Sequence, residues 1–284
     1  MNIINKLKEW IQAMSNYKQI IYEKKENIVR LKMNRPRYRN AQSRLLLEEL
    51  DQAFNQAVAD DDIRVIILSG EGDHFSSGHD LGTPEQKADE ARRPYPSGIM
   101  GAYRKQWEQF HDMGVRWRDL PKPTIAEVHG YCIFGGWLIA SAMDIIIASE
   151  DALFLPSLLQ YFSVPWDIGV RKAKEILFQT RFVTAQEACE LGFVNCIVPR
   201  DKLKAETQKL AERIADSDPI STRLAKVSIN QVQDGAGFRV AVQSAFSNYM
   251  IFHEAGLVRT EKEKQEGKRS LSRVDRALKH LKNK

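Results

Sequence analysis

Apolar residues along the chain follow two alternating periods, which together predict an α/β fold. Mostly apolar runs at Val65–Leu68, Thr124–Val128 and Asp144–Ala148 suit strands that are buried on both faces of a sheet. Between these runs the apolar positions recur at helical spacing, as they do from Leu46 to Ala57. Because buried strands alternate with helices, we expect right-handed βαβ units.

Both ends of the chain differ from this central part. Apolar residues at helical spacing in the first 16 or so residues predict a short amphipathic helix, which we expect to pack on the body or on a partner subunit rather than on a membrane. Two strands are predicted next, at Gln19–Glu23 and Asn27–Met33. After about residue 200 only helices are predicted, with a break at Asp234–Gly237. The expected domains are an N-terminal helix (1–18), a core (19–200) and a C-terminal helical region with a basic tail (201–284).

Charge and cysteine content narrow the classes of function. The formal net charge is +5, but lysine and arginine concentrate in the tail from Arg259 to Lys284. Such a tail can meet nucleic acid, anionic lipid or a nucleotide phosphate. Because acidic residues interrupt it, we expect a solvated helical end and no nucleic-acid partner. The three cysteines match no disulfide, zinc or redox pattern, which indicates a reduced, cytoplasmic compartment. No apolar run is long enough for a membrane span.

Two glycine-containing turns follow buried strands and are the candidates for chemistry. The first is Phe75–Leu81, in which small residues allow the backbone to approach a ligand closely. The second is Gly130–Trp137, in which Gly135-Gly136 opens a helix and leaves free N–H groups at the positive end of its dipole. After the first turn, Thr83 is predicted to cap a helix, with Gln86 completing a capping box. Either turn alone is weak evidence of a site.

Five blocks in order make the combination specific, and with them the sequence resembles the enoyl-CoA hydratase/isomerase (crotonase) superfamily over roughly residues 19 to 250. The blocks are Asn34-Arg35-Pro36 with Asn40-Ala41, then Phe75–Leu81, then Lys122–Ala126 with Gly130-Tyr131 and Gly135-Gly136, then Asp144-Ile145, and last Thr184-Ala185, Glu187-Ala188, Gly192, Val194-Asn195 and Val198-Pro199.

The resemblance implies a fold and an assembly. The fold is the α/β crotonase-like (ClpP/crotonase) spiral of ββα units, with a C-terminal helical region that packs between subunits. A homotrimer or hexamer is therefore expected. No metal or redox cofactor is implied, because coenzyme A arrives as part of an acyl-CoA substrate.

The resemblance also implies a mechanism. The backbone N–H groups of His79 and Gly135 would hold the thioester oxygen as an enolate forms, and preorganised amides of this kind stabilise developing charge. The imidazole of His79 is expected at the surface. The residues expected to contact the substrate are Arg37, Tyr38, Ser77, Gly78, Asp80, Leu81, Gly136 and Trp166. The guanidinium of Arg37 suits a coenzyme A phosphate, although it equally fits a plain surface charge, and Asp80 also fits a turn residue.

The chain departs from the family's two-glutamate hydratases at both acidic positions. Leu138 stands at the first and Leu158 or Leu159 at the second, so the two-glutamate mechanism is not expected. Asp167 stands where some members, such as dienoyl-CoA isomerases and aryl-CoA dehalogenases, carry a catalytic aspartate. Beside Trp166 in an apolar pocket its pKa would rise toward that of a general base. The alternative is that Asp167 is a helix N-cap.

Weaker candidates and the identity of the reaction stay open. Glu127 and His129 flank a strand end and rank below Asp167. Residues 82–118 are expected to form a wet insertion with a mobile loop at Arg92–Pro96 over the acyl pocket. Five aromatic residues could line that pocket or pack in the core: Trp107, Trp117, Phe134, Trp137 and Trp166. Hydration, isomerisation, hydrolysis and carbon–carbon cleavage all remain possible, and the rival class is a non-catalytic acyl-CoA- or RNA-binding member of the same fold.

Overall fold

A computed structural model describes residues 17–156, 159–265 and 272–282 of the chain. The expected N-terminal helix lies almost wholly outside the described residues, as does part of the basic tail. Within the described residues, no helix has both the length and the apolar character needed to cross a membrane.

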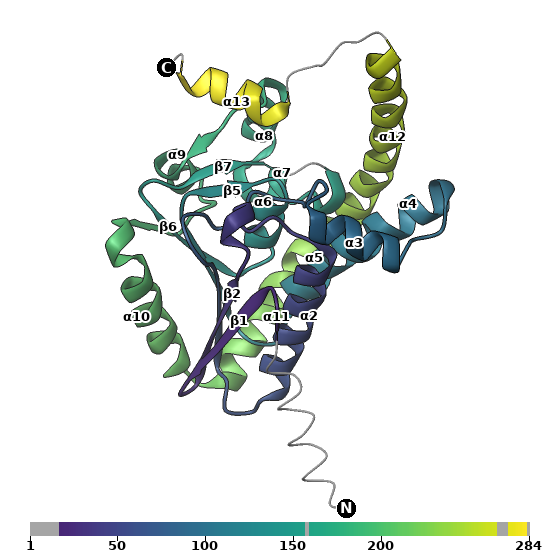
Figure 1. The fold of residues 1–284 in the computed structure, drawn as a ribbon. Helices are drawn as coiled ribbons and strands as arrows, with labels where there is room; N and C mark the ends of the chain where they lie inside the picture. The colour runs from purple at the N-terminus through teal and green to yellow at the C-terminus, as the bar shows by residue number, and fades with distance from the viewer. Residues whose placement is uncertain (1–16, 157–158, 266–271, 283–284) are drawn as a thin grey trace, which may run out of the picture.

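A six-stranded sheet forms the centre of the molecule (Figure 1). Its strands, in spatial order, are β1 (Ile20–Lys25), β2 (Ile28–Met33), β3 (Val65–Gly70), β4 (Thr124–Val128), β6 (Ile145–Ser149) and β9 (Cys196–Val198). The β1–β2 pair is antiparallel and every other pair is parallel. Parallel neighbours need crossover connections, and α2 (Arg44–Ala59) provides the one from β2 to β3. All five residues of β4 are buried, as its composition predicts.

A second, three-stranded sheet stands beside the first and establishes the spiral. Its strands are β5 (Tyr131–Ile133), β7 (Leu153–Leu155) and β8 (Val183–Thr184). The chain visits the two sheets alternately: β4 joins the large sheet and β5 the small one, then β6 the large and β7 the small. Helix α6 (Gly135–Ser141) closes the first of these turns. The result is the expected spiral of ββα units.

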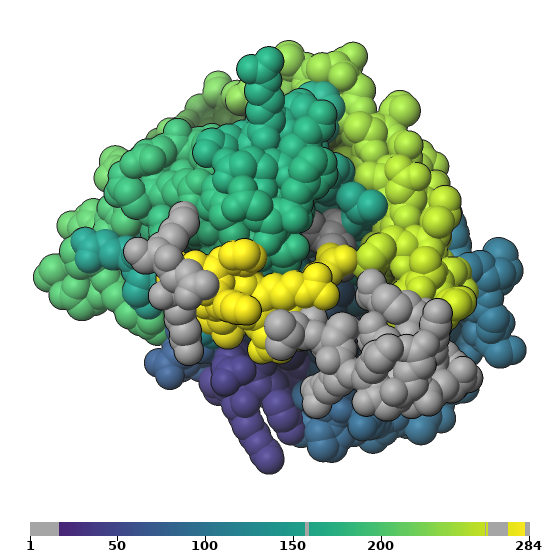
Figure 2. All heavy atoms as spheres, turned by 90° about the horizontal axis from the view of Figure 1, so that it is seen from above, coloured from purple at the N-terminus to yellow at the C-terminus, as the bar shows by residue number. Residues whose placement is uncertain are grey.

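Helices cover both faces of the large sheet and continue to the C-terminus. Helix α10 (Leu203–Ala215) packs on one face, in a cluster with β2, β3, β4 and β6, whereas α2 packs on the other (Figure 1). The break predicted at Asp234–Gly237 is confirmed, because α11 (Pro219–Gly235) ends there and α12 (Phe238–Gln265) begins directly after it. The remaining helices are η1 (Pro36–Tyr38), η3 (Leu159–Tyr161), α7 (Val164–Ile168), α8 (Val170–Gln179), α9 (Ala185–Glu190), η4 (Arg200–Lys202) and α13 (Arg273–Lys282). Helix α13 lies at the surface, on the face seen from above (yellow in Figure 2).

The segment 82–118 is mostly helical, and the loop expected at Arg92–Pro96 lies in the link between two of its helices. It forms α3 (Pro84–Arg92), α4 (Gly98–Gln106), a π-helix η2 (Trp107–Asp112) and α5 (Met113–Arg118). The short link between α3 and α4 is anchored, because Arg93 pairs with both Asp89 and Glu48. Thr83 caps α3 as predicted by accepting from the Gln86 N–H. The capping box is absent, since the side-chain oxygen Oε1 of Gln86 instead accepts from the backbone N–H of Arg44.

Candidate functional site

The two predicted turns lie against each other. Ser76 N–H donates to Tyr131 O at 2.8 Å, and Ile133 N–H donates to Ser76 O at 3.0 Å. The first turn therefore extends the small sheet beside β5. The packing requires glycine: a Cβ on Gly78, whose φ is +89°, would stand 2.7 Å from Ile133 O and 3.1 Å from the nitrogen of Gly135.

The backbone of Gln42 determines where the His79 N–H points. Gln42 N–H donates to Gly78 O at 2.8 Å, and Asp80 N–H donates to Gln42 O at 3.0 Å. In such a parallel bridge the residues on either side of His79 bond to Gln42, so the backbone groups of His79 itself face the other way. No described residue accepts a hydrogen bond from the His79 N–H. This donor is therefore free for a ligand.

The second donor is the N–H of Gly135 at the start of α6. The first N–H groups of a helix have no intrahelical partner, and no described residue accepts from this one. Phe134, just before it, adopts φ 48°, which turns the chain sharply into the helix. A Cβ on Gly135 would stand 2.6 Å from His79 Nδ1 and 2.2 Å from Gln42 Oε1. The two free amides thus belong to backbone segments in direct contact.

A cavity of about 720 Å³ opens beside the first turn. Its lining includes five of the predicted substrate-binding residues, Arg37, Tyr38, Ser77, Asp80 and Leu81, together with His79. Leu81 is 98% exposed and so is available to a ligand. Gly78 and Gly136 do not line this cavity; they pack the two turns together instead.

Asp80 and Tyr38 also hold the walls of this cavity. Asp80 Oδ1 accepts from the N–H groups of Gly82 and Thr83, at 2.9 Å and 2.8 Å, and its other oxygen pairs with Arg35 at 2.8 Å. This is the turn role that the sequence allowed for Asp80. The Tyr38 hydroxyl donates to Glu85 at 3.1 Å.

The imidazole of His79 does not lie free at the surface, in contrast to the position expected: the residue is only partly exposed, and its ring packs against other side chains. Its Nε2 lies 2.9 Å from Gln160 Nε2, and its Nδ1 lies 3.3 Å from Gln42 Oε1. The ring centroid is 3.7 Å from that of Phe110. Desolvation of the ring lowers the pKa of His79 to about 4, so the ring is neutral at physiological pH. Gln42 and Gln160 were not predicted from the sequence, because uncharged amides belong to no motif.

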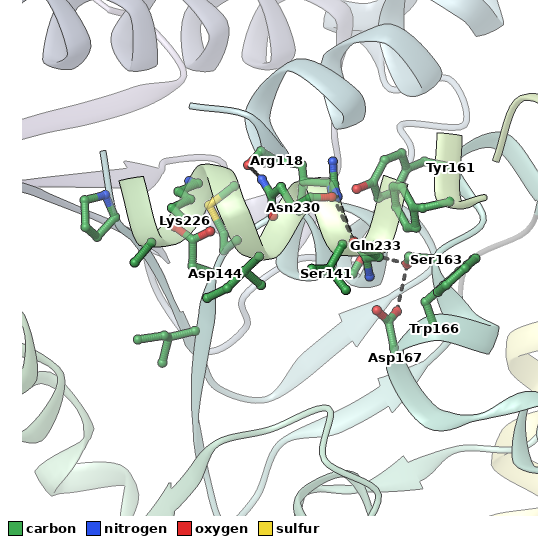
Figure 3. Close-up of a pocket in the computed structure, with 18 of the residues that line it drawn as sticks. Arg118, Ser141, Asp144, Tyr161, Ser163, Trp166, Asp167, Lys226, Asn230 and Gln233 are labelled. Atoms are coloured by element: carbon green, nitrogen blue, oxygen red, sulfur yellow. Dashed lines mark hydrogen bonds and ion pairs between the residues drawn. The ribbon is translucent and has the colours of Figure 1, made fainter. Parts of the chain in front are cut away.

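Asp167 lies inside α7 and not at its cap. Its Oδ2 accepts from the Ser163 hydroxyl at 2.7 Å and from the Trp137 indole N–H at 3.0 Å (Figure 3). The N-cap interpretation is wrong: Asp167 lies within α7, the helix that follows, α8, has Gly169 at its N-cap, and no described backbone N–H donates to the Asp167 side chain. Burial raises the pKa of Asp167 to about 6, against the opposing effect of these two hydrogen bonds. A carboxyl group with this pKa can exchange a proton near neutral pH.

The carboxyl group of Asp167 lines a second cavity, of about 850 Å³. Trp166 and Tyr161 share this lining, and α11 forms the opposite wall (Figure 3). Neither His79 nor Gly135 lines it. Helix α6 connects the two places, because Trp137, which donates to Asp167, follows Gly135 by two residues. The predicted site residues are thus not brought together in one cavity: those near the first turn line the cavity of about 720 Å³, Trp166 and Asp167 line the second, and Gly78, Gly135 and Gly136 line neither.

Comparison with known proteins decides the family. The model of the family described as enoyl-CoA hydratase/isomerase matches residues 23–266. This chain belongs to that family. A Mycobacterium tuberculosis protein named "Putative enoyl-CoA hydratase EchA13" is 37% identical over 245 residues, which cover 80% of this chain and 77% of that protein.

Solved structures of enoyl-CoA hydratase/isomerase proteins share the fold. The crystal structure of a probable enoyl-CoA hydratase from Mycobacterium smegmatis is 40% identical with a TM-score of 0.77, and the match covers 84% of this chain and 96% of that one. An enoyl-CoA hydratase/isomerase from Xanthobacter autotrophicus Py2 is 34% identical with a TM-score of 0.76, over 83% of this chain and 87% of that one. These matches confirm both the family and the fold predicted from the sequence.

Within the enoyl-CoA hydratase/isomerase family, this chain has apolar side chains at the two positions that the resemblance assigned to the hydratase glutamates. Leu138 is buried on α6, and Leu159 lies in η3; Leu158 is outside the described residues. The weaker candidates are engaged elsewhere: Glu127 pairs with the buried Arg30, and His129 Nε2 lies 2.9 Å from Gly72 O. No described residue with a proton to exchange therefore replaces the glutamates at their own positions.

The five aromatic residues divide between core and cavity. Trp117 and Trp137 are fully buried, and Trp117 donates its indole N–H to Asp51 at 2.8 Å. Trp107 packs edge-on against Phe246 of α12. Of the five, only Trp166 lines the cavity of Asp167.

Among the described residues, no group of three or more His, Cys, Asp or Glu side chains could hold a metal ion.

Proposed function

We propose that this protein acts on an acyl-CoA thioester and stabilises the enolate through the backbone N–H groups of His79 and Gly135. The observation that carries the proposal is that these two donors have no acceptor among the described residues and lie on backbone segments in contact. Amides aimed in advance at developing charge need no reorganisation when the reaction occurs. Each such donor supplies roughly 3–4 kcal/mol of transition-state stabilisation in known enzymes.

The coenzyme A part of the substrate would enter through the cavity of about 720 Å³ beside the first turn. Arg37 and Arg39 line it, and guanidinium groups bind phosphate through paired hydrogen bonds. No described acceptor or carboxylate pairs with Arg37, whose guanidinium lies 5.4 Å from the ring centroid of Tyr38. It is therefore available to a phosphate at no cost in broken ion pairs.

Asp167 is the group that we propose transfers the proton. Leu138 and Leu159 cannot exchange one, so a two-glutamate hydration does not fit this chain, and an isomerase-type proton transfer fits better. The acyl group would have to run along α6, from the amide pair toward Trp137 and Asp167. The pKa of about 6 supports the role, because Asp167 can then act as a base near neutral pH.

We further propose that the protein assembles into a homotrimer or hexamer and is cytoplasmic. No residue of helix α11 is buried as a whole in the single chain, and large apolar side chains stand exposed along it at Ile220, Leu224, Val227, Ile229 and Val232. Exposed apolar surface of this extent is typical of subunit interfaces. Light scattering after size-exclusion chromatography should give a multiple of three chains; a monomer at micromolar concentration contradicts the proposal.

The activity is tested by incubating the protein with a panel of acyl-CoA esters. Mass spectrometry distinguishes gain of water, loss of coenzyme A and chain cleavage, and exchange in deuterated water reports isomerase-type proton removal. We expect exchange of an α- or γ-proton for at least one ester. The second candidate is a non-catalytic acyl-CoA-binding protein, which the leucines at the glutamate positions favour. It is identified if esters bind but none is exchanged or converted.

A further inference from the structure

We infer that the imidazole of His79 is a positioning residue, which holds both backbone donors of the oxyanion hole in place. The inference rests on the proposed function, in which only the backbone of His79 takes part. It assigns the side chain a separate role, together with Gln42 and Gln160.

The hydrogen bonds around the ring define its protonation state. The side-chain nitrogen Nε2 of Gln160 is an NH₂ group, which can donate but not accept. At 2.9 Å it therefore donates to His79 Nε2, which must hold a lone pair. The proton of the neutral ring is then on Nδ1, which faces Gln42 Oε1 at 3.3 Å. Gln42 and Gln160 are 3% and 1% exposed, so water does not compete for these bonds. The ring is therefore held in a single tautomer by two side chains from distant parts of the sequence.

The same ring packs against Gly135, the residue that carries the second donor. The space into which a side chain of Gly135 would extend is filled by His79 Nδ1 and Gln42 Oε1, at 2.6 Å and 2.2 Å from the ideal Cβ position. The imidazole also packs on Phe110, with the two ring centroids 3.7 Å apart. The ring thus contacts both η2 and the start of α6. A shift of the ring would move the His79 peptide to which it is attached and the Gly135 peptide that it touches.

Gln42 connects the His79 ring to the first turn, Phe75–Leu81. Its backbone bonds to the residues on both sides of His79. Its side-chain NH₂ group donates to Ser76 Oγ at 3.2 Å, and Ser76 Oγ in turn accepts from the Gly78 N–H at 3.2 Å. On the far side, Gln160 Nε2 also donates to Gln106 Oε1 at 3.2 Å. Buried networks whose members are all paired hold one geometry, which is what two amide donors need if they are to meet one oxygen.

A purely structural role predicts different behaviour from a positioning role. If His79 only fills space, Phe should replace it well, since its ring has a similar shape and Phe110 offers an aromatic partner. If the hydrogen bonds position the amides, Gln is the better replacement, because its carbonyl can accept from Gln160 while its NH₂ donates to Gln42. The two substitutions therefore separate packing from positioning.

The kinetic test compares His79→Phe, His79→Gln and the wild type on the ester that the panel identifies. We expect His79→Phe to lower kcat by about 10- to 100-fold with KM changed less than about threefold, since misaligned donors affect the transition state more than ground-state binding. His79→Gln should recover kcat to within about fivefold. His129→Phe is the matched control, because His129 lies outside both cavities and its Nε2 contacts Gly72 O instead. Wild-type kcat in His79→Phe overturns the inference.

Two further measurements keep the inference testable if His79→Phe does not fold. Nitrogen-15 NMR of the wild-type imidazole should show a neutral ring protonated on Nδ1 at pH 7, and protonation on Nε2 overturns the inference. Gln160→Leu removes the hydrogen bond from Gln160 to His79 Nε2 and should lower kcat by about fivefold or more without raising KM. Failure of the proposed function is distinguishable from both results, because the wild type itself would then neither exchange nor convert any ester.

Discussion

The indole of Trp137 donates to Oδ2 of Asp167 at 3.0 Å, joining the helix that begins at Gly135 to the one acidic side chain proposed to move a proton. The Ser163 hydroxyl is the other donor to this oxygen, at 2.7 Å. Two neutral donors do not compensate the desolvation of this carboxylate fully, so its pKa stays raised. Asp167 can therefore exchange a proton near neutral pH, and it lines the cavity of about 850 Å³ rather than the one lined by His79.

Replacing Asp167 with Asn should abolish most turnover. Asn keeps the shape and can still accept from Trp137 and Ser163, but it cannot take a proton. A positioned general base contributes about 10²–10⁴-fold to rate, so kcat should fall within that range while acyl-CoA affinity changes little. The measurement is steady-state kinetics together with proton exchange in deuterated water.

Asp144→Asn is the matched control for Asp167→Asn. Asp144 lines the same cavity but pairs with Lys226 and accepts from the Thr124 N–H, so it serves structure. Its substitution should leave kcat within about threefold of wild type at a temperature where the variant is folded. If Asp167→Asn exchanges substrate protons at the wild-type rate, another group moves the proton.

The raised pKa of Asp167 also predicts how stability changes with pH. The folded state holds this proton more tightly than the unfolded state between about pH 4 and 6, so the contribution of Asp167 to folding declines as the pH rises through that window. A shift of this size corresponds to about 3 kcal/mol at most. Asp167→Asn should therefore be more stable than wild type at pH 8, by on the order of 1–3 kcal/mol, with a much smaller difference at pH 4. Urea denaturation at both pH values measures it; a difference that is equal at both contradicts the shift.

The sequence predicted the central strands of the large sheet well, because they are continuous apolar runs. Thr124–Val128 was predicted with its observed bounds, and Val65–Leu68 lacks only two residues of β3. The three-residue strands β5, β7 and β9 were not predicted, since so few residues show no period. In the segment 82–118 only the start of α3 at Thr83 was predicted, because charged and aromatic side chains obscure the apolar face of the other helices.

The candidate site was predicted in part for similar reasons. Glycine turns are visible in a sequence, and the structure brings Gly78 and Gly135 into contact as expected. Its match to the position of a catalytic aspartate in some family members made Asp167 a candidate, but no periodicity could show which cavity its carboxyl group would line. The position of the His79 ring depends on Gln160, which lies 81 residues away in the chain. Contacts over such separations follow from the tertiary fold alone.

Gly78→Ala should impair catalysis beyond the strain of its backbone conformation. The added methyl group would stand 2.7 Å from Ile133 O and 3.1 Å from the Gly135 nitrogen, so it must push the two turns apart. Gly192→Ala is the matched control, because Gly192 has a similar φ of +82° but open space around it. Both variants pay the cost of placing alanine at positive φ, on the order of 1 kcal/mol. We expect kcat to fall at least about tenfold in Gly78→Ala alone; equal kinetics in the two variants would show that the contact between the turns is unimportant.

Arg37 should contribute to the recognition of coenzyme A rather than of the acyl group. A ligand that binds only the folded state at 100 times its Kd adds about 2.7 kcal/mol to stability, so acyl-CoA should raise the Tm by a few degrees. The corresponding free acid should not, because it lacks the phosphates that Arg37 and Arg39 would bind. Arg37→Gln should weaken the shift by acyl-CoA, whereas Arg213→Gln, on α10 and outside the lining of this cavity, should not. Differential scanning fluorimetry with acyl-CoA, free coenzyme A and free acid measures each contribution. Equal stabilisation by the ester and the free acid would mean that this cavity does not recognise a coenzyme A thioester, and the proposed function would fall with it.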